Sequence, residues 1–189
     1  MDVAGPLRRA ATGVRCNNDR MHLELASEDF LNLRDVGIVG PWIEVLTFRV
    51  RGSGDDTAVL TELLASRWYD HSYAEPRREH PGPRFGLHGP YLLERISPST
   101  FTPAGADEAR ARVRAWATQW DELPAPFTRR LDDLLGVALP DDATLYELPD
   151  IRAAAEHEWG GVVGFDGFHE FVAISAQRDG VTLLVASDD

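Results

Sequence analysis

The sequence predicts an α+β fold in which a mainly antiparallel sheet carries about four helices, within a single domain. Three observations favour this class. Alternating apolar and polar residues mark several short strands, apolar residues at helical spacing mark four helices, and an Asp-Gly turn at 179–180 predicts that the last two strands form a hairpin. Because the long helices are grouped between strands, we expect them to pack on one face of the sheet.

The most clearly patterned strand is predicted at 42–51. Its apolar residues of one parity are expected to face the core: Trp42, Leu46, Phe48 and Val50. Weaker patterns predict further strands near 21–26, 91–96, 165–175 and 181–187. In the strand at 21–26, His22 has the polar parity, so we expect it to point to solvent.

Four segments carry apolar residues at the i, i+3, i+4 spacing of an amphipathic helix: 56–70, 107–123, 126–136 and 150–159. Asp55 or Asp56 can cap the first helix, because a short acidic side chain accepts a hydrogen bond from a backbone N–H of the first turn. Pro124 separates the second helix from the third, and we expect these two to pair as a helical hairpin.

The length of 189 residues favours one domain. We assign residues 20–189 to this single α+β domain and residues 1–19 to a flexible N-terminal arm. The segment 71–90 holds four prolines and three glycines and breaks every regular pattern. A loop of this length inside a compact domain is commonly functional or disordered.

Charge narrows the classes of partner. The chain has 31 Asp and Glu residues against 19 Lys and Arg residues, a formal net charge of -12. Binding to nucleic acid depends on the opposite sign, because its affinity comes from counterions released by Lys and Arg. No stretch approaches the roughly 20 apolar residues that a membrane helix needs. We therefore expect neither a nucleic-acid partner nor a membrane, and an acidic surface favours a basic partner.

The counts of lysine and cysteine limit the possible chemistry and the cellular compartment. All 19 basic residues are Arg, which is typical of a GC-rich bacterial genome and excludes a catalytic Lys, a Schiff base and a Walker-type phosphate loop. The single cysteine, Cys16, excludes an internal disulfide and a multi-cysteine zinc site. A reducing cytoplasm fits this composition.

Two His-Glu dipeptides, His157-Glu158 and His169-Glu170, are the candidate metal ligands. Helical His ligands usually come as an i, i+4 pair, and neither dipeptide has such a partner. We therefore predict no bound metal and no cofactor.

Glu170 and His169 are the candidate catalytic residues. Glu170 shares its parity with Phe168, Val172 and Ile174, so its carboxylate is predicted to lie on an apolar strand face. A buried carboxylate needs a partner, and an Arg is the expected one: Arg49, Arg95 or Arg152. The alternative is a general acid or base that lines a cleft together with His169.

The loop at 71–90 is the candidate ligand-binding segment. Its Arg and His side chains could recognise a small anionic ligand through a carboxylate or phosphate: Arg77, Arg78, Arg84 and His88. The alternative is a solvated surface loop.

No Gly-x-Ser-x-Gly elbow, Gly-x-Gly-x-x-Gly turn or plausible Cys-His pair is present, so hydrolase, dinucleotide-binding and thiol-protease functions have no support. Two function classes remain. The first is a binding or accessory protein, immunity-like or inhibitor-like, that recognises a basic partner. The second is a small cytoplasmic enzyme, such as a tailoring enzyme of specialised metabolism, that uses His169 and Glu170 in a cleft near the 71–90 loop.

Residues 131–142, with the sequence LDDLLGVALPDD, resemble the opening helix and turn of a domain superfamily that includes bacterial toxin-immunity proteins. Fewer than 50 residues follow this stretch, too few for the rest of that fold. The resemblance therefore assigns no functional residue.

Overall fold

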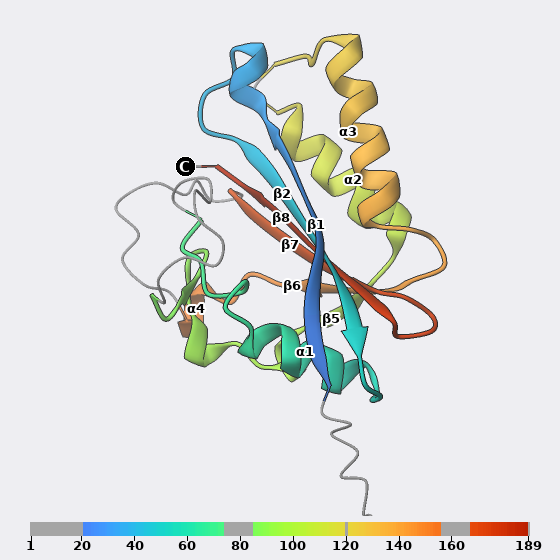
Figure 1. Ribbon diagram of the computed structural model, residues 1–189. Helices are drawn as coiled ribbons and strands as arrows, with labels where there is room; N and C mark the ends of the chain where they lie inside the picture. The colour runs from blue at the N-terminus through green and yellow to red at the C-terminus, as the bar shows by residue number, and fades with distance from the viewer. Residues whose placement is uncertain (1–20, 74–84, 120, 156–166, 189) are drawn as a thin grey trace, which may run out of the picture.

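The computed structural model describes residues 21–73, 85–119, 121–155 and 167–188. Its main sheet has six strands in the order β1-β2-β8-β7-β6-β5, and each neighbouring pair is antiparallel (Figure 1). They are β1 (His22–Asn32), β2 (Trp42–Arg51), β5 (Thr102–Ala104), β6 (Thr144–Leu148), β7 (Phe168–Ile174) and β8 (Gly180–Ser187). The predicted α+β class and the β7-β8 hairpin are confirmed. The arm predicted at 1–19 lies outside the described residues.

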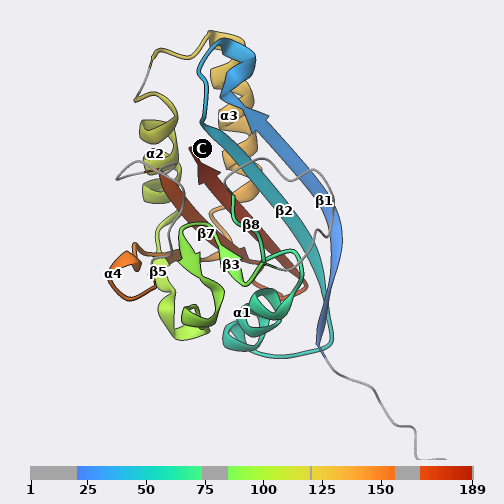
Figure 2. The same cartoon turned by 90° about the vertical axis from the view of Figure 1, so that its left-hand side faces the viewer.

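Helices cover both faces of the sheet rather than one (Figures 1 and 2). α2 (Ala106–Ala117) and α3 (Ala125–Ala138) pack on one face, and α1 (Asp56–Ala65) packs on the other. The first half of β2 explains the difference, because it carries buried apolar side chains at both parities. Trp42 and Leu46 join the core under α1, whereas Ile43 and Val45 join the core under α2 and α3.

β1 is longer than predicted because a β-bulge conceals its alternation. The pairing with β2 shifts between Leu25 and Ser27. Leu25 therefore packs toward α1, whereas Leu31, beyond the bulge, packs under α2 and α3. His22 is exposed, as predicted. After β1, a short 3-10 helix (Leu33–Val36) ends at Gly37, whose φ of 91° is the left-handed conformation that favours glycine.

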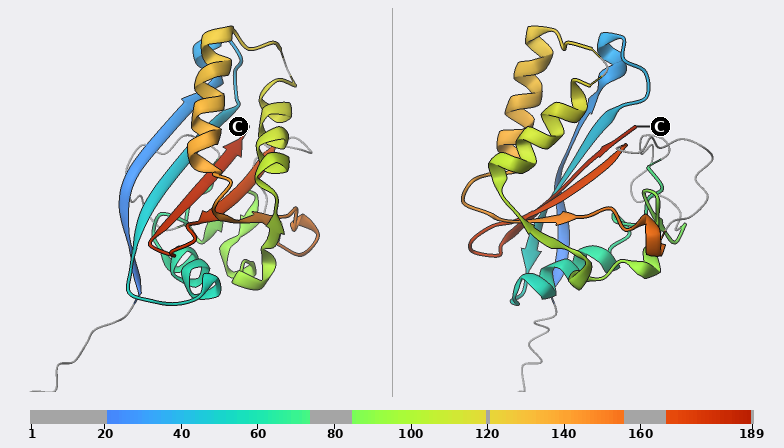
Figure 3. Two further views of the ribbon diagram at one scale, coloured as in Figure 1. Left: turned by 90° about the vertical axis from the view of Figure 1, so that its right-hand side faces the viewer. Right: turned by 180° about the vertical axis from the view of Figure 1, so that it is seen from behind.

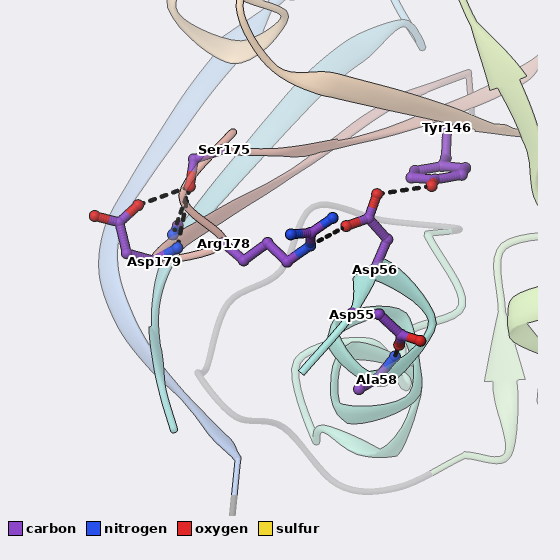
Figure 4. Close-up of polar contacts among 8 residues, drawn as sticks. Asp55, Asp56, Ala58, Tyr146, Ser175, Arg178 and Asp179 are labelled. Atoms are coloured by element: carbon purple, nitrogen blue, oxygen red, sulfur yellow. Dashed lines mark hydrogen bonds and ion pairs between the residues drawn. The ribbon is translucent and has the colours of Figure 1, made fainter. Parts of the chain in front are cut away.

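α1 begins as the sequence predicts. The Asp55 side chain accepts a hydrogen bond of 2.9 Å from the N–H of Ala58. Asp56 links this helix to the sheet, because its carboxylate accepts hydrogen bonds from Tyr146 at 2.9 Å and from Arg178 at 2.5 Å (Figure 4). The start of α1 is thereby fixed to β6 and to the turn between β7 and β8.

The predicted helical hairpin is present as α2 and α3, which share one core cluster. The Arg114 Nε atom lies 2.6 Å from an Asp132 carboxylate oxygen across their interface. The helix predicted at 150–159 is described only as α4 (Arg152–Ala155), and its remainder lies outside the described residues.

The strand predicted at 91–96 does not belong to the main sheet. Only Tyr91–Leu92 is extended, as β4, and it pairs with β3 (Leu87–His88) in a separate two-stranded sheet. The chain then turns into a 3-10 helix (Leu93–Arg95). Gly89 in this hairpin lies so close to the Phe168 ring that a Cβ atom would come within 2.3 Å of it. The hairpin is thereby held against β7.

None of the described helices is long and apolar enough to cross a membrane.

Candidate functional site

His169 and Glu170 lie on opposite faces of β7, because successive side chains of a strand alternate. His169 packs beside Trp116 of α2, with ring centroids 6.1 Å apart. Glu170 lies on the other face, where it contacts Tyr69 and His88. The structure therefore does not bring the two candidate catalytic residues together.

Glu170 is held by a buried hydrogen-bond network. The Tyr69 hydroxyl donates to Oε1 at 2.8 Å, and His88 Nε2 lies 2.5 Å from Oε2. His88 Nδ1 lies 2.5 Å from the backbone carbonyl of Tyr69, and the rings of these two residues stack with centroids 3.5 Å apart. All three residues are fully buried.

The partner of Glu170 is thus a histidine and a tyrosine in place of the predicted arginine. Arg49 and Arg95 are exposed on the surface, and Arg152 forms an ion pair of 2.5 Å with Asp150. A carbonyl oxygen can only accept a hydrogen bond, so the N–H donor of this contact is His88 Nδ1 and the acceptor is the backbone carbonyl of Tyr69.

The network is suited to holding the chain in place. Burial, and then the neighbouring Glu170 carboxylate, raise the pKa of Tyr69 well above its ordinary value, so its hydroxyl remains a donor. Each group in the network already has a hydrogen-bond partner, and none reaches the surface. In this arrangement Glu170 attaches Tyr69 and His88 to the sheet.

Glu44 and His71 are also buried on this face. Glu44 on β2 is opposite Val185, which is itself opposite Glu170, so the two acidic residues occupy one row across three strands. His71 packs against Tyr73, with ring centroids 4.5 Å apart. Among the described residues, however, no group of three or more His, Cys, Asp or Glu side chains is arranged to hold a metal ion.

Arg77, Arg78 and Arg84, the candidate ligand-binding arginines, lie outside the described residues. His88, which the sequence grouped with them, is in the core. At the loop's far end, one carboxylate oxygen of Asp70 accepts hydrogen bonds of 2.9 Å from the N–H groups of Phe85 and Gly86. Asp70 thereby positions the chain that enters β3.

An open groove lies between β1 and α3, which run side by side (Figure 3, left). It has a volume of about 250 Å³. Its helical wall is one stripe of α3 at i, i+3, i+4, i+7 spacing: Arg130, Asp133, Leu134 and Val137. Its other wall is Asp29–Leu31 of β1. Val137 is 72% exposed, which is unusual for a large apolar side chain.

The carboxylates of the groove differ from those on the neighbouring surface in their ion pairing. Arg110 lies 2.5 Å from Asp141, Arg114 pairs with Asp132, and Arg112 pairs with Glu147. By contrast, neither Asp29 nor Asp133 has an ion-pair partner among the described residues. The Arg130 guanidinium donates to the Phe30 carbonyl at 3.0 Å rather than to either carboxylate. The groove therefore combines the apolar Leu134 and Val137 with two carboxylates that no described cation pairs with.

Sequence reasoning did not find this groove. The stripe on α3 mixes charged and apolar residues, a pattern that is also typical of an ordinary solvated helix face. The position of β1 at the sheet edge follows from strand order, which depends on pairing between distant segments. The one local signal is an apolar residue, Val137, that falls outside the buried stripe of Leu131, Leu135 and Ala138.

The chain matches no protein-family model, no curated protein and no solved structure.

Proposed function

We propose that this protein is a binding or accessory protein that recognises a basic segment of a partner protein in the groove between β1 and α3. The observation that carries the proposal is the pair of carboxylates, Asp29 and Asp133, that line the groove with the apolar Leu134 and Val137 and have no ion-pair partner within the described part of the chain. A basic segment would supply that cation, and the aliphatic stems of its side chains would cover Val137.

The chemistry of the groove disfavours a small anionic ligand there, since two carboxylates repel it. Its volume of about 250 Å³ is also below the range of roughly 300–1,000 Å³ that is typical of small-molecule pockets. A chain segment that lies along the groove and extends beyond it suits this size better.

The net charge of -12 supports the same class of partner, because an acidic protein attracts a basic one and speeds their encounter. An immunity-like or inhibitor-like role is one form that this binding could take. The single cysteine supports a cytoplasmic setting. An enzyme that uses Glu170 is the weaker proposal, because that carboxylate has no exposed surface.

The test uses the full chain and a fluorescent ten-residue peptide of alternating Arg and Val. Binding is measured by anisotropy at about 20 mM and about 500 mM NaCl, and we expect the higher salt to weaken it at least tenfold. The double variant Asp29→Asn, Asp133→Asn should weaken low-salt binding about tenfold, as the loss of two charge contacts near 0.7 kcal/mol each implies.

The matched control is Glu94→Gln with Asp142→Asn, which removes the same charge from exposed positions outside the groove. We expect it to change binding less than twofold. Equal losses in the two double variants, or binding that is independent of salt, would contradict the proposal. A Glu and Val peptide of the same length should not bind.

A further inference from the structure

We infer that the partner's basic segment binds as an added β-strand along the outer edge of β1, with α3 as the wall of the site. This inference rests on the proposed function and specifies the shape of the partner segment. It starts from the strand order, in which β1 pairs with β2 and with no other described strand (Figure 2). An edge strand presents backbone donors and acceptors that another chain can pair with.

The two edges of the main sheet differ. At one edge, β5 has three residues and includes Pro103, which lacks a backbone N–H, so it offers little to a further strand. At the other edge, β1 has eleven residues. A long edge strand beside a groove is the geometry in which proteins bind extended peptides by main-chain hydrogen bonds.

The hydrogen bond from Arg130 shows which backbone groups face the groove. Because the Phe30 carbonyl accepts from α3, it points away from β2. In an antiparallel strand the N–H and C=O of one residue point the same way and alternate along the chain, so Glu28 and Asn32 also direct theirs outward. An incoming strand therefore meets backbone groups at 28, 30 and 32.

The helical wall limits the length of the bound segment. Arg130 and Val137 are seven residues apart, which corresponds to about 10 Å along a helix. An extended strand covers that distance in about three residues. The core of the interaction is therefore short, and it consists of about three strand residues that run beside α3.

The alternation of the added strand sets its sequence preference. Asp29 is opposite Val45 of the core under α2 and α3, so both carboxylates lie on the α3 side of the added strand. Arg or Lys side chains on that face reach Asp29 and Asp133, and their aliphatic stems cover Leu134 and Val137. The side chains between them point to the other face of the sheet, which carries Phe30, and Val or Ile suits these positions. A segment with Arg or Lys alternating with Val or Ile satisfies both requirements.

A second copy of this chain is a poorer occupant than a basic partner. Antiparallel pairing of two β1 edges would bring two copies together that each carry a formal net charge of -12, and would place the Glu28-Asp29 pair of both copies along one seam. Like charges opposite one another destabilise a strand pair. The protein should consequently remain monomeric while it binds the basic peptide, which analytical ultracentrifugation can verify.

Arg130 donates a hydrogen bond to the Phe30 carbonyl, which an added strand would use as an acceptor. The Arg130 side chain must therefore move away when the strand binds. Replacing it with alanine frees that acceptor and removes a like charge from the basic segment. We expect Arg130→Ala to tighten binding of the Arg and Val peptide at least threefold. The control is Arg129→Ala, which removes the same charge from an exposed neighbour that does not line the groove, and its effect should be smaller than twofold.

The decisive probes are two N-methylated forms of the Arg and Val peptide, one methylated at every Val nitrogen and the other at every Arg nitrogen. In an extended strand the two sets of N–H groups lie on opposite edges, so only one set can pair with β1. We expect one methylated peptide to lose at least tenfold in affinity and the other to lose less than threefold.

The outcomes separate the two claims. If the unmethylated peptide binds with the expected salt and Asp dependence but both methylated forms behave alike, strand addition is wrong and the proposed function stands. If Arg130→Ala and Arg129→Ala have equal effects, the assigned position of the strand beside Phe30 is wrong. If the unmethylated peptide shows no salt-dependent binding, the proposed function itself fails.

Discussion

Glu170 and His88 are 82 positions apart in the chain, yet the Oε2 atom of one and the Nε2 atom of the other lie 2.5 Å apart in the core. Glu170 belongs to the main sheet, and His88 belongs to the small hairpin that covers it. Their contact joins two parts of the fold that share no backbone hydrogen bonds between their strands. We therefore regard it as an attachment of the hairpin to the sheet.

Glu170→Gln should lower the free energy of unfolding by about 1–3 kcal/mol, because an NH₂ group would replace the oxygen that lies 2.5 Å from His88 Nε2 or the oxygen that accepts from Tyr69. Urea denaturation at pH 7 measures this change. The control is Glu94→Gln at an exposed site, where we expect a change within about 0.5 kcal/mol. Folded Glu170→Gln should bind the Arg and Val peptide as the parent does. A variant as stable as the parent would show that the network does not hold the hairpin.

Tyr69→Phe should also lower the free energy of unfolding, by about 1.5–3 kcal/mol, because it removes the hydroxyl that donates to the Glu170 carboxylate. Tyr146→Phe is the matched control. It removes a similar hydroxyl, which donates to Asp56 at 2.9 Å, but from a position that is only partly buried. Its cost should be smaller, about 0.5–1.5 kcal/mol. An equal loss in free energy of unfolding for the two variants would contradict the prediction that burial makes the Tyr69 hydrogen bond the more stabilising one.

Alkaline pH should destabilise the protein through its buried tyrosines. Burial, together with Asp150, raises the pKa of Tyr91 to about 12 from its ordinary value of 10.0. Above pH 10 the unfolded chain loses the Tyr91 proton while the folded chain keeps it, so stability falls as pH rises from about 10 to 12. Tyr91→Phe should show a shallower fall in urea midpoint over that range. Parallel pH profiles for parent and variant would contradict this.

The cap of α1 offers a test that is independent of the core. Asp55→Ala removes the acceptor of the Ala58 N–H and should lower the free energy of unfolding by about 1 kcal/mol. Asp55→Asn keeps an acceptor at the same position and should cost less. Thermal melting of both variants measures the difference. If the two variants melt together well below the parent, the charge rather than the hydrogen bond is responsible.

The sequence predicts those elements whose signal is local. β2, with its alternation from Trp42, begins and ends where expected, and α1 begins at the cap formed by Asp55. β6 was missed although its residues, TLYEL, include strand-forming Thr and Tyr before Pro149, because five residues give only a weak alternation. β5 was missed because Pro103 argues against a strand, and only its edge position makes proline acceptable.

The candidate sites depended on contacts between distant segments, and sequence reasoning reached them only in part. The parity of β7 predicted that Glu170 is buried, which the structure confirms. Parity alone could not identify His88 as its partner, since that choice depends on how the hairpin folds over the sheet. The groove beside β1 requires the strand order and the position of α3, neither of which has a local signal.

The central claim is that the basic peptide binds in the groove between β1 and α3. Mapping the peptide-binding site by backbone amide chemical shifts tests this claim most directly. The full chain, isotopically labelled, is titrated with the Arg and Val peptide at low salt. We predict that the largest shift changes fall at residues 28–32 of β1 and 130–137 of α3. Largest changes at the segment 69–73, at the hairpin that contains His88, or at β7 around Glu170 would contradict the account.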